Sequence, residues 1–275
     1  MINKSVGDKI LNAFIILFCL FSLFPLYWLF TGAFKTSAAI VTFPPQWFPH
    51  DPTLVNFRNI FVDNPALRWI FNSMFVSTVS TLGVIVTATT AGYAISKFKF
   101  IGKKFVFGFV IATLILTLEV YVLPLFQMMA NFGWIGTLRA MIAPELVMPL
   151  GVFLMKQHYD AMPNELMEAA GLDGCGKFRF FWSIGLPLTK PAIGALAILA
   201  FIRVWNNYLW QFVMSRGRDS FTLPVGVASL FVDPNVIDHG LRFVGATVAA
   251  IPLLLIFAFF SRYFTAGITA GSVKG

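Results

Sequence analysis

The sequence predicts an all-α, polytopic membrane protein with six transmembrane helices and a helix–turn–helix loop on its cytoplasmic side. Hydrophobic residues make up 58% of the 275 residues and charged residues only 12%, whereas soluble domains carry about 25% charged residues. The apolar residues form long runs separated by short basic stretches, and a single polar segment near residue 170 carries helix and turn signals. A chain with so little polar surface is expected to have lipid as its solvent.

Six stretches are long enough to cross a bilayer, which takes about 20 mostly apolar residues. The first has no charge over 25 residues and contains Pro25 as an expected kink. This run is longer than the apolar core of a removable signal peptide, so we expect the segment to be retained as a helix. The second is rich in Ser, Thr, Gly and Ala, which let helices approach closely. The spans are expected at about 10–34, 69–96, 105–130, 137–155, 188–214 and 243–261, in one domain without an evident internal repeat.

Basic residues set the expected orientation, because loops rich in Lys and Arg stay in the cytoplasm. Four lysines fall within eight residues between the second and third spans: Lys97, Lys99, Lys103 and Lys104. With the N-terminus inside, twelve Lys and Arg lie inside and seven outside, and Arg203 remains within a span. Both termini are therefore predicted to be cytoplasmic. The net charge of +8 suits contact with anionic lipid headgroups. The Lys and Arg residues form no dense basic stripe of the kind that binds nucleic acid.

Two external segments are long enough to contact another protein. Residues 35–68 are rich in Pro and aromatic residues, which collect in the headgroup region. Within them, Leu54, Phe57, Ile60 and Phe61 recur at helical spacing and predict a short interfacial helix. Residues 215–240 link the last two spans.

The longest cytoplasmic loop, 163–187, predicts two short helices joined by a turn. Pro163 suits the first helical turn, and Asp173-Gly174 is a turn signal. Four residues of the first helix share a face by helical spacing: Glu165, Glu168, Ala169 and Leu172. The second helix is expected around Phe178, Phe181 and Trp182, and Pro187 is expected to open the fifth span. Small residues at the tip, Ala169, Ala170 and Gly174, would permit close insertion into another protein's groove.

The spacing within this loop carries a family resemblance. Glu168-Ala169-Ala170 is followed after three residues by Gly174, and after nine more by Ile184, Leu186 and Pro187. This pattern resembles the EAA loop of permease subunits of bacterial binding-protein-dependent ABC importers. The flanking sequences, Trp205–Leu209 and the tail Thr269–Gly275 are similar to the carbohydrate branch, in particular to maltose-permease-like second subunits.

The resemblance implies a permease in the bacterial inner membrane that moves a sugar or sugar-like solute but does not hydrolyse ATP. Its expected partners are a second, different permease, two copies of an ATPase that hold ATP and Mg²⁺, and an external solute-binding protein; the chain itself is expected to hold no cofactor. The EAA loop would dock on the ATPase through Glu165, Glu168, Ala169, Ala170, Asp173, Gly174, Ile184, Leu186 and Pro187. ATP binding would favour an outward-facing state, and hydrolysis would reset it. The sequence leaves the solute open.

Several other sequence patterns predict no binding or catalytic site. Gly171 to Phe178 nearly matches a phosphate-binding loop, but Phe178 stands where a hydroxyl must hold Mg²⁺. The three histidines lie in different loops without metal-ligand spacing. No set of residues is arranged for catalysis, and Cys19 and Cys175 predict no disulfide framework.

Ionisable and aromatic residues within the spans form a candidate solute path. Ionisable groups are costly in lipid and usually face a bundle interior or a wet cavity. Glu119, Glu145 and Arg203 could therefore line the solute path, or they could form structural ion pairs or lie near the membrane interface. Aromatic faces and amide groups suit a polyhydroxylated solute, although helix packing uses the same residues. The remaining candidates are Tyr121, Trp205, Asn206, Asn207 and Tyr208.

Two other functions remain as alternatives. An ion-coupled secondary transporter would use Glu119 or Glu145, but that class is commonly built from internal repeats within one chain. A membrane scaffold without transport would not explain the EAA spacing.

Overall fold

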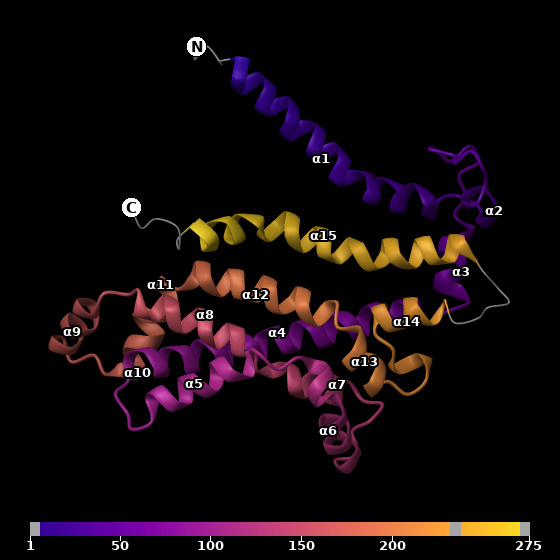
Figure 1. Cartoon of the computed structure of the whole chain (residues 1–275). Helices are drawn as coiled ribbons and strands as arrows, with labels where there is room; N and C mark the ends of the chain where they lie inside the picture. The colour runs from indigo at the N-terminus through magenta and orange to yellow at the C-terminus, as the bar shows by residue number, and fades with distance from the viewer. Residues whose placement is uncertain (1–5, 232–237, 270–275) are drawn as a thin grey trace. The chain divides into compact units, whose positions relative to one another are not determined.

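The computed structural model describes residues 6–231 and 238–269, and every regular element within them is a helix. These residues fall into two compact units (Figure 1). The first unit is drawn from 1–66 and 227–251, and the second from 67–226 and 252–275. Four helices of the described chain are long and apolar enough to cross a membrane, or six spans if each of two bent pairs counts as one.

The first unit joins the N-terminal helix to two short helices and to the start of the last helix. These are α1 (Val6–Ala33), α2 (Ser37–Ile40), α3 (Val55–Val62) and α15 (His239–Thr269). Asn56 is buried and donates hydrogen bonds to the carbonyls of Ala33 at 3.1 Å and Lys35 at 2.7 Å. Gly240 lies against the same side chain, where a Cβ would come within 2.3 Å of Asn56 Oδ1. The predicted short helix is thus α3, although Asn56 and Ile60 face inward.

The aromatic segment after α1 folds back on the end of that helix. Tyr27 donates its hydroxyl to the Trp47 carbonyl at 2.6 Å. The buried Lys35 ammonium donates to the Gln46 carbonyl and lies 4.2 Å from the centre of the Trp28 ring. Burial lowers the pKa of Lys35, and these two contacts partly replace its lost hydration.

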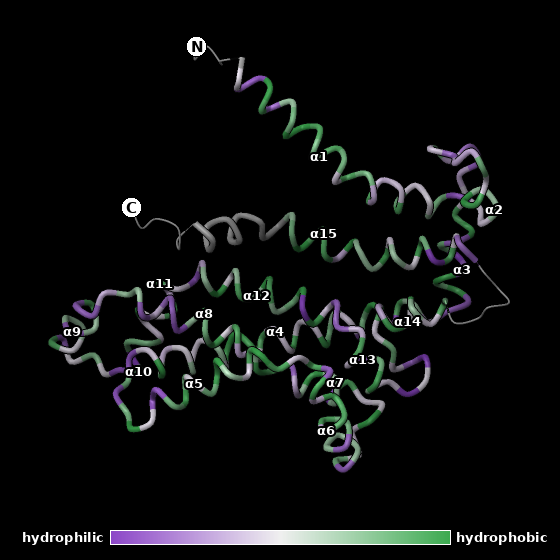
Figure 2. Tube along the Cα trace, in the orientation of Figure 1, coloured by the Kyte–Doolittle hydropathy of each residue, from purple (hydrophilic) through white to green (hydrophobic). Residues whose placement is uncertain are grey.

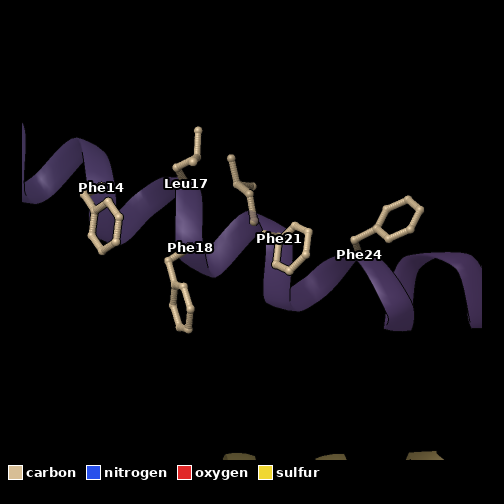
Figure 3. Close-up of a pocket in the computed structure, with 6 residues that line it drawn as sticks. Phe14, Leu17, Phe18, Phe21 and Phe24 are labelled. Carbon is tan, nitrogen blue, oxygen red and sulfur yellow. The ribbon is translucent and has the colours of Figure 1, made fainter.

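Most of α1 carries exposed apolar side chains, shown in green in Figure 2. A hollow of about 530 Å³ runs along it and is lined by α1 side chains alone, among them Phe14, Leu17 and Phe18. Figure 3 shows Leu17 and Phe18 projecting to opposite sides of the single helix. Because one helix cannot enclose a ligand, we regard this hollow as an apolar surface of α1 and not as a binding site.

The second unit contains the remaining helices, two 3₁₀ turns and one π turn. Its elements are α4 (Ala66–Lys97), α5 (Lys103–Thr113), α6 (Leu118–Asn131), α7 (Leu138–Ile142), a 3₁₀ turn (Ala143–Leu146), α8 (Pro149–Asp160), α9 (Asn164–Leu172), α10 (Lys177–Phe180), a π turn (Phe181–Gly185), α11 (Leu186–Leu188), α12 (Lys190–Trp205), α13 (Tyr208–Met214), a second 3₁₀ turn (Arg218–Ser220) and α14 (Leu223–Ser229). The start of α4 and the end of α14 adjoin the first unit in sequence.

The third expected span, 105–130, is two helices that meet at 101° and not one continuous helix. At the end of α5, Leu114, Ile115 and Leu116 each bond to the carbonyl three residues earlier, which tightens the last turn. Thr117 is then extended, with φ −86° and ψ 155°, and redirects the chain into α6.

The fifth expected span, 188–214, is also interrupted. It consists of α12 and α13 and breaks at Asn206-Asn207, because the Asn207 side chain caps α13 by accepting from the Trp210 amide at 3.2 Å. Pro187 does not open this span as expected: it lies in α11, and Pro191 takes the first turn of α12. The fourth apolar stretch runs from Leu138 to Asp160, five residues beyond the prediction.

Two clusters of buried side chains stabilise the second unit. One gathers around Tyr93, Met155 and Phe180 and joins α4, α8, α10 and α12. The other gathers around Met141 and Trp210 and joins α4, α6, α7, α12 and α13. Since α4 and α12 contribute to both clusters, these two helices connect the two ends of the unit.

Candidate functional site

The start of α9 is fixed by the last residue of α4. The Lys97 ammonium donates to the Met162 carbonyl at 2.8 Å and to Asn164 Oδ1 at 3.0 Å. Pro163 precedes the helix, with φ −53° and ψ 134°, one residue earlier than the expected first-turn position. The lysine therefore ties the first residues of α9 to a helix of the membrane region.

The end of α9 is fixed by Gly174. The Cys175 amide donates to the Ala170 carbonyl at 2.9 Å, and the Gly174 amide donates to the Gly171 carbonyl at 3.1 Å. Gly174 has φ +74°. This is a Schellman motif, in which the left-handed residue is normally glycine. Ala170 belongs to the cluster around Tyr93, and Cys175 packs against the same cluster. The glycine of the sequence motif is thus required by the turn.

Ala170 differs from the expectation that it lies at an exposed tip. Its side chain is buried in the cluster around Tyr93, whereas Ala169 is exposed. The reason is that α9 packs one face on the unit, and residue 170 lies on that face. Among the small residues at the tip, only Ala169 and Gly174 remain open to another protein.

A group of aromatic rings packs beneath α9 and α10. We call this group the aromatic seat; it consists of Tyr93, Tyr159, Phe180 and Phe181. The Tyr93 ring lies 5.0 Å from the Phe181 ring and 5.3 Å from the Tyr159 ring, and it stacks on Phe180 at 6.4 Å between ring centres. Its hydroxyl donates to the Lys177 carbonyl at 2.8 Å, at the start of α10.

The second half of the EAA pattern, Ile184 to Pro187, lies next to the same aromatic seat. Ile184 and Leu186 are half-buried against the cluster, while Pro187 is exposed. These two apolar residues therefore hold the π turn and α11 against the unit.

A polar link joins the ends of α4 and α8 beside this seat. The Ser96 hydroxyl donates to Asp160 Oδ1 at 2.6 Å, and the Lys156 ammonium contacts Asp160 Oδ2. Sequence reasoning missed Tyr93 and Lys97, which lie far along the chain from the loop that they contact, and Asp160, which lies just before that loop. No local pattern pointed to them, since Lys97 was used only to set orientation.

The outer face of α9 and α10 is a ridge of charged and large apolar side chains, with carboxylates on α9 and the exposed Lys177 and Arg179 on α10. Glu165, Glu168, Ala169 and Asp173 are all exposed on it. Leu172 is 91% exposed and Phe178 75% exposed, and Trp182 is more than half exposed. Large apolar side chains gathered on a polar surface mark a contact site for another protein. Figure 1 shows α9 at one end of the second unit, with α7 and α13 toward the other.

At the opposite end, Glu145 joins three elements of the second unit. Its side chain is 5% exposed and accepts from Arg203 at 2.9 Å through Oε2 and from Asn207 at 2.6 Å through Oε1. The Arg203 side chain is 41% exposed. The structural pairing considered for Glu145 and Arg203 is therefore present, and it fixes the break between α12 and α13 to the turn after α7.

The other candidate path residues have different surroundings. Trp205 is buried and stacks on Phe201, and Tyr208 is partly exposed and stacks on Phe212. Asn206 is exposed at the break. Glu119 and Tyr121 lie in the first turns of α6, and among the described residues no hydrogen bond or ion pair joins either to Glu145. A solute path along these residues stays a prediction.

Nowhere in 6–231 or 238–269 do three His, Cys, Asp or Glu side chains come together as a group that would hold a metal ion.

Comparisons with known proteins identify the family. The profile of the family described as "binding-protein-dependent transport system inner membrane component" matches residues 54–270. The arabinooligosaccharides transport system permease protein of Halalkalibacterium halodurans is 36% identical over 257 residues, 92% of each chain. The sn-glycerol-3-phosphate transport system permease protein of Brucella abortus is 30% identical over 275 residues, 97% of each chain.

A solved structure shares the fold. A chain from the crystal structure of a bacterial ABC transporter involved in the import of the acidic polysaccharide alginate matches with a TM-score of 0.82. The match covers 96% of this chain and 100% of that chain at 20% sequence identity.

Proposed function

The chain belongs to the inner membrane components of binding-protein-dependent transport systems, and on that premise we propose that it is a permease whose α9–α10 ridge docks on a separate ATPase. The exposed ridge of Leu172, Phe178 and Glu168 carries this proposal. Apolar side chains this exposed are stabilised when a partner covers them, and the neighbouring carboxylates add a charge that a basic partner surface can pair with.

The seat of the ridge supports a role in transmitting movement. Tyr93 and Lys97 belong to α4, and they contact α10 and the start of α9 directly. A displacement of the ridge therefore acts on α4, which continues to the cluster around Met141 and Trp210. Packed interiors are dense and transmit strain, so closure of an ATPase pair would move the far end of the unit.

The partners follow from the family. A second, different permease would complete the path, and two ATPase copies would hold ATP and Mg²⁺, so that this chain neither binds nor hydrolyses the nucleotide. An external binding protein would meet 35–68 and 215–240, of which 232–237 lie outside the described residues. Both termini would be cytoplasmic, and the tail from Thr269 would reach the ATPase, although 270–275 also lie outside the described residues.

The solute class is proposed from the relatives, whose names refer to arabinooligosaccharides and sn-glycerol-3-phosphate. We assign this chain a sugar or sugar-like solute. The exposed Asn206 and Tyr208 at the break between α12 and α13 would offer hydrogen bonds to it, with Glu145 and Asn207 holding the break in place.

The test is to purify the chain from membranes and measure the ATPase that stays bound. Glu168→Lys reverses a charge on the ridge and is expected to lose the ATPase and ATP-driven uptake of whichever solute the external binding protein retains. Asp51→Lys makes the same change in the exposed segment after α1 and is expected to keep the ATPase bound. If uptake continued without the ATPase and stopped when the proton gradient was collapsed, the ion-coupled alternative would replace this proposal.

A further inference from the structure

A polar hollow of about 290 Å³ lies between the end of α4, the start of α5 and α9. Three lysines line it: Lys97, Lys99 and Lys103. Asn164 and Glu168 line its other side, on α9. Three ammonium groups against one carboxylate leave the hollow with a net positive charge.

Internal hydrogen bonds hold two of the lysines in place. Lys103 donates to the carbonyls of Ser96 at 2.7 Å and Phe98 at 3.2 Å. Lys97 is held by Met162 and Asn164. By contrast, Lys99 is exposed, and among the described residues its ammonium has no hydrogen-bond or ion-pair partner. The hollow therefore has two fixed positive charges and one that is available to a ligand.

The loop beside the hollow has the composition of a membrane interface. Residues 98–102 lie between the end of α4 and the start of α5, each of which belongs to a candidate membrane span. Ile101 is fully exposed at the tip, and Phe100 and Phe105 are exposed beside it. Figure 2 shows both hydrophilic and hydrophobic colours along the trace where the chain passes into α5. Apolar side chains next to lysines are typical of segments that lie among lipid headgroups.

We propose that this hollow binds the headgroup of an anionic phospholipid beside α9. A phosphate diester carries the opposite charge to the hollow, its oxygens accept hydrogen bonds from Lys99 and Lys97, and its acyl chains can lie along Ile101 and Phe105. Because Asn164 and Glu168 form the α9 side of the hollow, the bound headgroup contacts the helix that carries the ridge. This inference goes beyond the proposed coupling, since lipid binding requires no ATPase.

The test uses the purified complex in nanodiscs of phosphatidylcholine, alone or mixed with phosphatidylglycerol, with retained lipid counted by native mass spectrometry. Lys99→Gln removes the available charge and is expected to weaken phosphatidylglycerol retention about fivefold, the contribution of one lysine at an anionic surface. Lys104→Gln is the matched control, since Lys104 is exposed in the first turn of α5, next to Lys103, but does not line the hollow. It is expected to keep the lipid.

Three results would overturn the proposal. Equal loss of phosphatidylglycerol in both variants would assign the effect to diffuse surface charge. Displacement of the lipid by inorganic phosphate alone would make the ligand a free anion. Release of the ATPase by Lys99→Gln in phosphatidylcholine alone would make the ligand an acidic side chain of the partner.

Discussion

Single residues of the EAA pattern have different physical roles. Glu168 is exposed on the ridge, Ala170 is buried beneath it, and Gly174 ends the helix with a positive φ. A substitution at each position is therefore expected to affect a different property: the proposed contact with the partner, packing on the seat, or the backbone of the turn.

Gly174→Ala tests the backbone role. A Cβ disfavours the left-handed conformation by about 1 kcal/mol, so the variant is expected to melt at a lower temperature even though no atom lies within 4 Å of that Cβ. Gly176→Ala is the control, because Gly176 has φ −66° and equally open surroundings. Equal melting temperatures for the two variants would contradict the assigned turn.

Arg203→Met tests the pairing of Glu145. The variant leaves a carboxylate that is 5% exposed without its cation, which is expected to cost about 1–3 kcal/mol of folding free energy. Adding Glu145→Gln removes the unpaired charge, so the double variant is expected to be more stable than Arg203→Met alone. Chemical denaturation in detergent would measure both, and strictly additive losses would contradict the pairing.

Among the elements, α4 has the central position in the second unit. It supplies Val76 to one buried cluster and Tyr93 to the other, and its last residue holds α9. A stiff helix that contacts both ends is suited to carry a displacement from the ridge to the break between α12 and α13.

Tyr93→Phe tests this connection. The ring stays in the aromatic seat, but the hydrogen bond to the Lys177 carbonyl is lost, which is expected to cost about 1 kcal/mol. Hydrogen exchange should become faster in Lys177–Gly185 and stay unchanged in α13. Tyr208→Phe on α13 is the control and should leave Lys177–Gly185 as protected as before; the same change in both variants would contradict the connection.

The elements also show what the sequence can and cannot reveal. Long charge-free runs predicted α1, α4 and α15 closely, since a bilayer-crossing helix needs little more than length and apolar composition. The breaks at Thr117 and Asn207 were missed because each lies within a long, mostly apolar run. The breaks depend on the local backbone at Thr117 and on side-chain capping by Asn207. The contact between Tyr93 and Lys177 joins residues 84 apart, which no spacing rule reveals.

At the scale of the whole molecule, the described chain presents three kinds of surface. The α1 surface is apolar, the loop of residues 98–102 is mixed, and the α9–α10 ridge carries charged and apolar side chains. A soluble protein would not leave so much apolar surface exposed. Each surface therefore has an expected neighbour: lipid or another permease for α1, headgroups for the loop, and an ATPase for the ridge.

Photo-crosslinking in native membranes tests the central claim most directly. A photoreactive amino acid in place of Leu172, which projects from the ridge, is expected to attach to the ATPase and to lose that adduct with Glu168→Lys. The same amino acid in place of Ile101 is expected to attach to lipid. A Leu172 probe that attached to lipid, or to no ATPase, would contradict the account.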